Sequence, residues 1–430
     1  MVTDNKPNGA SEGSNLWRVT ADTAAELSLN QGATDVDVLV IGGGFTGLRT
    51  AIELADSGHS VALVEAGDLG WGASGRSGGQ VNPIMRLQSR KLASLIGEAA
   101  ADRLIRATIG SANEVFQLIA RHGMACDATQ RGWAQVAHCD SAAESLRGLA
   151  EDWRRFGANI QELDKEETWE ATGSTVYEFS LLHPFAGHLH PLKYVHGLAR
   201  TAVSKGAAIY THAPAQDLRP RNGRWEITAN NQAFIADKVL ICTNAYQSGL
   251  NDTLDKSYIP VTPVQLATEV LDDDVYEAVL PEERTIADTR RMIFYARKTA
   301  DRRLVFGGLG TRIDGQADYD RIAREATRVF PQLLSVKWEY SWGGHIAMTT
   351  DSLPHVHEVA QGVYAALGCN GRGVAMGTVV GRVLSEIINE PGTEKDVPVI
   401  PLKKIPFQPL LKKIIPAGMP LLRVMDRMDR

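Results

Sequence analysis

Hydrophobic residues form a strand, helix and strand pattern near the start of the chain. Residues 36–41 (VDVLVI) are a short apolar run with β-branched side chains, which is typical of a strand buried in a parallel sheet. Residues 44–57 have the apolar spacing of a helix, and residues 60–65 form a second apolar run. The pattern therefore predicts a βαβ unit of ordinary length.

Helical periodicity returns in residues 91–122 and 141–156, where apolar side chains fall on one stripe. This predicts an inserted helical region. Further strands are predicted, with turn residues between many of them, at 207–210, 224–228, 238–242, 292–296, 303–307 and 362–367. Strands and helices mix along the whole chain, so the fold class is α/β.

The composition is that of a globular protein, with 430 residues, 44% hydrophobic and 22% charged. This length predicts two structural units. The formal net charge of -6 argues against a nucleic-acid partner, because phosphate backbones bind basic surfaces. The sequence shows neither a long apolar span nor an apolar signal segment, so we expect a cytoplasmic protein.

Cysteine and histidine positions predict no metal site. The four cysteines lie far apart, without a C-x-x-C pair. His183, His188 and His190 cluster in LLHPFAGHLHP but lack an acidic partner at ligand spacing. We interpret this histidine segment as a turn.

The segment VIGGGFTGL contains a nucleotide-binding pattern directly after the first predicted strand. Gly42 permits the tight turn, Gly44 lets the backbone approach a pyrophosphate, and Gly47 allows close packing of helix and sheet. Glu65 ends the second strand, where a carboxylate accepts hydrogen bonds from ribose hydroxyls. No second pattern of this kind has its own βαβ context, which disfavours a separate NAD(P)H site.

The motifs together resemble the D-amino-acid oxidase, sarcosine oxidase and glycine oxidase family of flavoproteins. WGASGRSGGQ (residues 71–80) is similar to the family loop that wraps the FAD diphosphate and runs beside the flavin. KVLICTNAY (238–246) and GVYAALGCNGRGV (362–374) resemble two further cofactor segments, the second of which begins the helix that points at the flavin pyrimidine. The resemblance implies a Rossmann-like, glutathione-reductase-like FAD domain interleaved with a mixed α+β substrate domain.

The fingerprint and the resemblance together assign a set of residues to FAD. They are Gly42, Gly44, Phe45, Thr46, Gly47, Glu65, Ala66, Gly72, Ala73, Ser74, Arg76, Ser77, Gly78, Gly79, Gln80, Ala215, Thr243, Asn244, Gly371, Arg372, Gly373, Val374 and Ala375. Family members with covalent flavin use a cysteine near the strand at residues 338–350, and this chain has none there. We therefore expect noncovalent FAD.

On the substrate side the chain departs from the amino-acid oxidases. Where those members carry W-x-G-x-R, with an arginine that clamps the substrate carboxylate, this chain has Ile346. Three residues are candidates for the catalytic site: Arg297 for a differently placed carboxylate, His345 as a proton acceptor, and Tyr295 on the strand that lines the family's substrate cavity.

The resemblance is greatest to γ-glutamylputrescine oxidases, which implies FAD-dependent oxidation of a C–N bond in a small amine or amino-acid derivative. Hydride transfer to flavin N5 would give an imine, then an aldehyde and ammonia. Two alternatives stay open: a secondary or cyclic amino-acid oxidase or dehydrogenase, acting on sarcosine- or pipecolate-like substrates, and a non-catalytic flavin-binding accessory subunit. The electron acceptor is O2 or a quinone.

The predicted organisation has four parts. They are an N-terminal arm (1–33) with Trp17 as its anchor, an FAD-binding domain (34–90, 151–250 and 337–395), a substrate domain (91–150 and 251–336) and a basic, proline-rich tail (396–430). Residues 398–430 carry seven basic and two acidic side chains. This charge predicts either peripheral contact with an anionic membrane or docking on a subunit. Prolines exclude a helix through 401–416 and leave only 421–430 helical.

Overall fold

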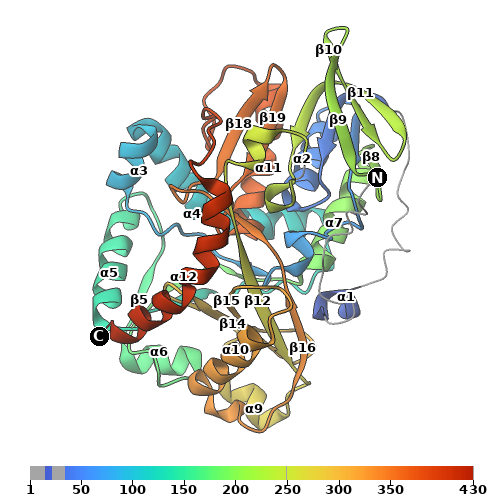
Figure 1. Cartoon of the computed structure of the whole chain (residues 1–430). Coiled ribbons are helices and arrows are strands. Elements are labelled where there is room, and N and C mark those ends of the chain that lie inside the picture. The colour runs from blue at the N-terminus through green and yellow to red at the C-terminus, as the bar shows by residue number, and fades with distance from the viewer. Residues whose placement is uncertain (1–14, 22–33, 248, 430) are drawn as a thin grey trace.

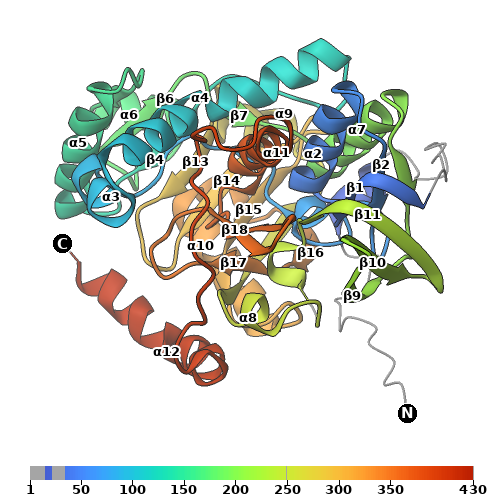
Figure 2. The ribbon, with the colours of Figure 1, turned by 90° about the horizontal axis from the view of Figure 1, so that it is seen from above.

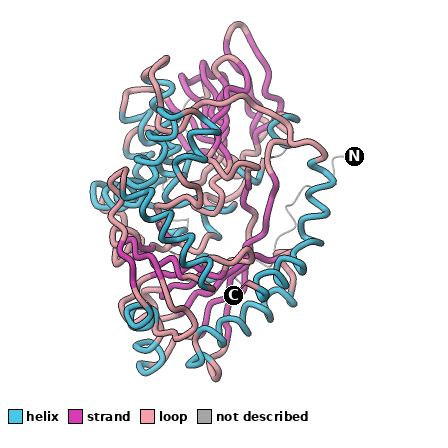
Figure 3. Tube along the Cα trace, turned by 90° about the vertical axis from the view of Figure 1, so that its left-hand side faces the viewer, coloured by secondary structure: helices cyan, strands magenta, loops and turns pink. Residues whose placement is uncertain are grey.

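The computed structural model describes residues 15–21, 34–247 and 249–429 and builds them around two β-sheets (Figure 1). Figure 3 shows the strands in two groups, an upper and a lower one, with helices at the left, below the lower group and at the right. A two-stranded ladder of β3 (Gln80–Val81) and β7 (Gly187–His188) lies apart from both sheets.

The first sheet contains the predicted βαβ unit. Its strand order is β18-β19-β11-β1-β2-β8, with the hairpin of β9 and β10 continuing from β11. The bounds are β1 (Asp35–Ile41), β2 (Val61–Val64), β8 (Ala208–Tyr210), β9 (Ala215–Arg221), β10 (Arg224–Ala229), β11 (Gln232–Ile241), β18 (His355–Ala360) and β19 (Val363–Leu367). Strand β1 pairs in parallel with β2 and β11. These strands confirm the predictions at 36–41, 60–65, 207–210, 224–228, 238–242 and 362–367.

Helices cover this sheet. Helix α2 (Phe45–Asp56) confirms the helix predicted at 44–57, and it packs against α11 (Gly373–Asn389) and α7 (Pro191–Ser204). The predicted helix over 91–122 is two helices, α3 (Ser89–Ile96) and α4 (Glu98–His122), because Gly97 has a φ of 84° between them. Further helices are α1 (Leu16–Thr20), α5 (Asp140–Arg154), α6 (Lys165–Thr172), α8 (Asp252–Asp255), α9 (Asp273–Ala278) and α10 (Gln316–Val329), with short 3-10 turns at Ala73–Arg76, Asn244–Tyr246 and Pro331–Leu333.

The second sheet has the order β16-β12-β15-β14-β13-β4-β6-β5, with β17 on β12. The bounds are β4 (Trp133–Val136), β5 (Gln161–Leu163), β6 (Ser180–His183), β12 (Ile259–Thr268), β13 (Thr285–Asp288), β14 (Phe294–Lys298), β15 (Leu304–Gly310), β16 (Trp338–Gly343) and β17 (Ile346–Met348). Strands β5, β6, β16 and β17 belong to this sheet, although the predicted bounds placed them in the FAD domain. Strand β12 escaped prediction because Pro260 and Pro263 interrupt its pattern.

Two described segments near the ends of the chain, residues 15–21 and α12, pack on this body. Trp17 is 1% exposed, and its indole N–H donates to the Ser77 carbonyl oxygen at 2.8 Å, so the described part of the arm is anchored as expected. The prediction for the tail was wrong, because α12 (Gln408–Met428) is a continuous helix with Pro416 and Pro420 inside it. Helix α12 docks on its own chain through α8 and the turn after β13. No helix in the described residues is long and apolar enough to cross a membrane.

Candidate functional site

A cavity of about 1240 Å³ runs between the two sheets. On the side of the first sheet it is lined by Gly42, Glu65 and Ala215, and on the side of the second sheet by Gln135 and Tyr295. Its volume exceeds the usual size of a small-molecule pocket. The space is therefore sufficient for a dinucleotide together with a small substrate.

The turn between β1 and α2 is closed around its glycines. Gly42 has a φ of 112°, in the left-handed region that favours glycine. A side chain on Gly47 would place its Cβ 2.0 Å from the Gly42 carbonyl oxygen, so the start of α2 can approach the strand only without one. Gly44 is the N-cap of α2, and the first residues of this helix, Phe45 and Thr46, line the cavity, with the Phe45 N–H donating to Ser74 Oγ at 3.1 Å. This is the geometry that a pyrophosphate requires.

Glu65 follows β2 at the wall of the cavity. Its carboxylate accepts N–H groups from Gly43 at 2.7 Å and from Gly67 at 3.0 Å. Burial raises the pKa of Glu65, although these backbone N–H groups act in the opposite direction. Each carboxylate oxygen has a further lone pair for a ribose hydroxyl. The position fits the ribose contact that the sequence predicted.

Four consecutive carbonyl groups of the loop at residues 75–78 are held by side chains from distant parts of the chain. The Gly75 oxygen accepts from Asn15 at 3.1 Å and the Ser77 oxygen from Trp17. The Gly78 oxygen accepts from Arg297 at 2.6 Å. The Arg76 oxygen accepts from Gln265 at 2.7 Å and from Trp342 at 3.0 Å. We call these five side chains the loop clamp.

The loop clamp orients the N–H groups of the same loop. In a trans peptide the C=O of one residue and the N–H of the next point in opposite directions. Because the carbonyls face the clamp, the N–H groups of residues 76–78 point away from it, and these residues line the cavity. Glycine at 78 keeps this approach open, since a Cβ there would lie 3.1 Å from the Tyr295 ring. The loop can thus present donors to phosphate or flavin oxygens.

The start of α11 forms another part of the wall. Gly371 has a φ of 83°, and Arg372 is the N-cap. Burial lowers the pKa of Arg372 to about 10, and its guanidinium donates to the carbonyl oxygens of Ile84 and Asn370. Helix α11 therefore directs its positive end and a cation at the cavity. Such a site can stabilise the negative charge of a reduced flavin.

Most predicted cofactor residues line this cavity. They are Gly42, Gly44, Phe45, Thr46, Glu65, Ala66, Gly72, Ala73, Ser74, Arg76, Ser77, Gly78, Gly79, Gln80, Ala215, Thr243, Asn244, Gly371, Arg372, Gly373 and Val374. Gly47 and Ala375 stand behind the wall, where Gly47 supports the turn and Ala375 is buried in α11.

The substrate side is a single row across the second sheet. Strand pairing places Gln135 opposite Ala287, Ala287 opposite Tyr295, Tyr295 opposite Gly307, and Gly307 opposite Gln265. Residues in register share a face of the sheet. The Tyr295 ring lies across Gly307, where a Cβ would meet it at 2.4 Å. The floor of the cavity is therefore an aromatic ring between two amides.

Both amides have an unused acceptor. The Oε1 atoms of Gln135 and Gln265 are buried without a hydrogen-bond partner among the described residues, and both residues line the cavity. A buried acceptor without a partner is costly, so a ligand N–H at this position would be stabilised. Sequence reasoning missed both glutamines, because only the register of the strands from β4 to β12 places them on one face of the sheet.

The other two catalytic candidates lie elsewhere. Arg297 is fully enclosed, and its guanidinium donates to carbonyl oxygens of Gly78, Leu189 and Lys298, so it belongs to the loop clamp and not to the described wall of the cavity. Burial lowers its pKa to about 9. His345 Nδ1 lies 3.1 Å from Thr262 Oγ1, while its neighbours Gly344 and Ile346 line the cavity. Burial and Arg76 lower the pKa of His345.

Two further arginines on the cavity wall were not predicted. Arg86 has an exposed side chain, because it faces the open space of the cavity. Protein surrounds this space, and the resulting loss of solvation lowers the pKa of Arg86. It donates to the Asp288 carbonyl oxygen at 3.3 Å, and no ion pair with a carboxylate is found for it among the described residues. Arg291 lies on the turn before β14, is 41% exposed, and pairs with Asp426 of α12. Isolated arginines give no sequence signal, so only the fold could reveal them.

Comparison with known proteins agrees with this geometry. Residues 37–387 match the DAO family model, described as FAD dependent oxidoreductase. The chain is 33% identical to a probable oxidoreductase OrdL of Haemophilus influenzae, with 82% of each chain covered. It is 30% identical to the gamma-glutamylputrescine oxidoreductase of Escherichia coli, over 84% of this chain and 85% of that protein.

Solved structures share the fold. Glycine oxidase from Geobacillus kaustophilus superposes with a TM-score of 0.71 at 22% identity, covering 84% of this chain and 96% of the other. L-proline dehydrogenase from P. horikoshii gives a TM-score of 0.72 at 19% identity, covering 85% and 96%. The chain therefore belongs to the DAO family of FAD-dependent oxidoreductases, which act on amines and amino acids.

Proposed function

We propose that this enzyme oxidises the primary amine of a small, γ-glutamylputrescine-like substrate that carries a carboxylate far from the reacting carbon. The product is an imine, which water converts to an aldehyde and ammonia. The observation that carries this proposal is the charge of the cavity wall, together with the 30% identity to the Escherichia coli enzyme.

Four arginines and one glutamate line the cavity in the described chain: Arg76, Arg86, Arg291, Arg372 and Glu65. Glu65, Arg76 and Arg372 belong to the cofactor side, and Arg291 is paired with Asp426 and Asp429, so Arg86 is the cation of the wall that is left for a substrate. A free diamine would bring two positive charges into this field, which is unfavourable. A substrate with a terminal carboxylate would compensate Arg86, whose guanidinium has donors to spare.

The location of this carboxylate distinguishes the substrate from a simple amino acid. Ile346 lines the cavity at the position that the sequence comparison assigns to the family's carboxylate arginine, and an aliphatic chain cannot bind an anion. Arg86 and Arg291 lie instead beside the end of β13. A carboxylate bound there belongs to the end of the substrate remote from the reacting amine.

The chain's own residues favour a neutral amine at the reacting position. No aspartate, lysine or histidine is found among the described lining residues, so no side chain of these kinds serves as a base there. Burial and nearby arginines both disfavour an ammonium group and promote loss of its proton to water. The acceptor Gln265 Oε1, which lies beside the Tyr295 ring, then holds an amine N–H group. Bound FAD supplies the hydride acceptor.

The two cysteines at the cavity wall are unsuited to covalent attachment of the flavin. Cys242 and Cys369 line the cavity, and burial raises the pKa of both thiols. A neutral thiol is a poor nucleophile. We therefore propose that FAD is held without a covalent bond, and denaturation in acid should release all of the yellow chromophore into solution.

Anaerobic mixing with a substrate panel tests the function. A γ-glutamyl diamine should bleach the flavin band at least tenfold faster than the free diamine at equal concentration. Faster bleaching by N-methyl amino acids or cyclic imino acids would replace the proposal with a secondary amino-acid oxidase or dehydrogenase. Absence of bleaching by all three classes would support an accessory subunit. Reoxidation of the reduced enzyme by O2 and by a soluble quinone identifies the acceptor.

A further inference from the structure

Helix α12 carries an unusual concentration of exposed apolar side chains. Seven of the 13 exposed large hydrophobic residues in the described chain are found at its N-cap or along its length. They are Phe407, Leu410, Ile414, Leu421, Val424, Met425 and Met428. Met428 is 73% exposed and Leu421 is 64% exposed. Single exposed hydrophobic residues are ordinary, whereas a set on one helix marks a contact surface.

These side chains form one continuous stripe. Residues 407, 410, 414, 421, 424 and 428 follow the spacing of three, four and seven residues that places side chains on one face of a helix. The buried residues Gln408, Met419 and Asp426 are separated by 11 and 7 positions and share another face. The helix therefore uses one face to dock and presents an apolar face outward.

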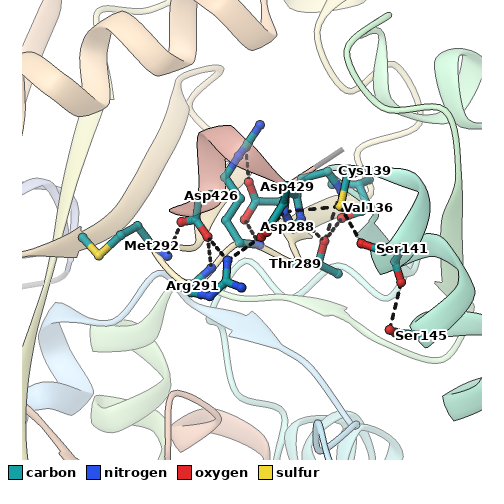
Figure 4. A network of polar contacts seen from close by, with 12 residues as sticks. Val136, Cys139, Ser141, Ser145, Asp288, Thr289, Arg291, Met292, Asp426 and Asp429 are labelled. Atoms are coloured by element: carbon teal, nitrogen blue, oxygen red, sulfur yellow. Dashed lines mark hydrogen bonds and ion pairs between the residues drawn. The ribbon is translucent and has the colours of Figure 1, made fainter. Parts of the chain in front are cut away.

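The docked face is fixed by polar contacts. Asp426 accepts the backbone N–H groups of Arg291 and Met292, both at 3.0 Å, and also pairs with the Arg291 guanidinium (Figure 4). At the other end, Gln408 donates to the carbonyl oxygens of Asp255 and Tyr258. Figure 2 shows α12 along the edge of the molecule, outside both sheets. These contacts hold the apolar stripe in place and prevent the helix from turning inward.

The charges on α12 select the kind of partner. Lys412, Lys413 and Arg427 are exposed on the helix. Its two acids, Asp426 and Asp429, are both bound by Arg291 (Figure 4). Two copies of this helix would bring like charges together without exposed acids to pair them, which disfavours self-association. An apolar stripe flanked only by exposed cations fits an anionic surface with an apolar interior.

We propose that α12 docks the enzyme on a membrane surface that contains anionic lipids. The apolar stripe enters the boundary between headgroups and acyl chains, and the lysines bind lipid phosphates. The helix lies in the plane of the surface and does not span it. Because Arg291 both lines the cavity and holds α12, docking places this part of the cavity wall on the membrane side of the enzyme. This inference does not depend on which amine is oxidised.

Sedimentation of the FAD-loaded full chain with vesicles tests the proposal. The enzyme should bind vesicles that contain phosphatidylglycerol at low salt and should not bind vesicles of pure phosphatidylcholine. Lys412→Gln together with Lys413→Gln should weaken binding about 30-fold, because each basic residue near the surface contributes about 1 kcal/mol. Leu410→Gln together with Leu421→Gln should abolish binding, with flavin content unchanged in both variants.

A matched control distinguishes binding through α12 from nonspecific binding through any exposed apolar side chain. Leu334 is 83% exposed and lies outside α12, so Leu334→Gln should leave vesicle binding unchanged. Equal loss in the Leu334 variant, or binding of the wild type to neutral vesicles, would overturn the proposal. Concentration-dependent dimerisation in sedimentation velocity that Leu410→Gln and Leu421→Gln prevent would also overturn it, because a second copy would then cover the stripe.

Discussion

The two sides of the cavity present different chemical groups, backbone groups on the nucleotide side and side chains on the substrate side. The nucleotide side uses backbone groups, whose positions depend on glycines such as Gly42 and Gly47. The substrate side uses side chains, Gln135, Tyr295 and Gln265, which strand register aligns from three separate parts of the sequence. A backbone site leaves a contiguous pattern in the sequence, whereas a site made by register leaves none. The comparison predicts how each side responds to substitution.

The nucleotide side should lose its affinity for FAD when one methyl group is added to the turn. Gly47→Ala would place Cβ 2.0 Å from the Gly42 carbonyl oxygen, which cannot move without opening the turn. We expect a loss of about 3 kcal/mol or more in FAD affinity, because backbone must shift. Flavin content after purification measures this. Gly110→Ala is the control, since nothing lies within 4 Å of its Cβ and alanine favours helix there by about 1 kcal/mol.

The substrate side should tolerate substitution with FAD still bound and lose selectivity instead. Arg86→Gln removes a cation from the wall, and a charge-assisted hydrogen bond contributes about 1.5 to 3 kcal/mol. We expect KM for a carboxylate-bearing amine to rise about 10- to 100-fold, with little change for an amine without a carboxylate. Steady-state kinetics with the two substrates measure the difference. Arg90→Gln, on the exposed surface of α3, should change neither value.

Acid should lower the stability of the fold through two buried histidines, His183 on β6 and His190 at the start of α7. Burial lowers the pKa of His190 to about 2 and that of His183 to about 3. Below the ordinary histidine pKa of about 6.5 the unfolded chain therefore binds more protons than the folded chain, and stability falls as pH falls. Each such histidine should cost about 2 kcal/mol at pH 5.

His190→Asn isolates one of these contributions. His190 Nδ1 accepts the Lys193 N–H as the N-cap of α7, and asparagine can keep a cap without titrating. The variant should lose less stability than the wild type between pH 7 and pH 5 in urea unfolding. His212→Asn, at an exposed position, should behave as the wild type does. Equal pH dependence in all three proteins would contradict the argument.

The smallest expected effect belongs to His345. The His345 ring forms a hydrogen bond with Thr262, and its neighbours Gly344 and Ile346 line the cavity while His345 does not. His345→Gln should therefore change kcat/KM less than about twofold, which is the size of effect that a surface substitution has. The pH profile of kcat/KM should keep its acidic limb, since the substrate amine itself loses the proton. Disappearance of that limb in the variant would make His345 the base.

The sequence predicted α2 and six of the eight strands of the first sheet, because each follows from local periodicity, and most of the residues that it assigned to FAD line the cavity. It failed for β12, where prolines hide a strand that the sheet accommodates, and for α12, whose internal prolines are tolerated in a docked helix. Arg297 illustrates the remaining limit. Its position on β14 was visible, but the direction of its guanidinium depends on Gly78 and Leu189, which are more than 100 residues away.

The loop clamp has a consequence for the order in which the protein assembles. Asn15 and Trp17 come from the start of the chain, Gln265 and Arg297 from the middle, and Trp342 from near the end. Contacts between such remote segments form late, because long stretches of chain must first be closed. The loop can therefore grip its ligand only after both sheets have met. A newly made chain acquires its colour last, and yellow absorbance reports completed folding.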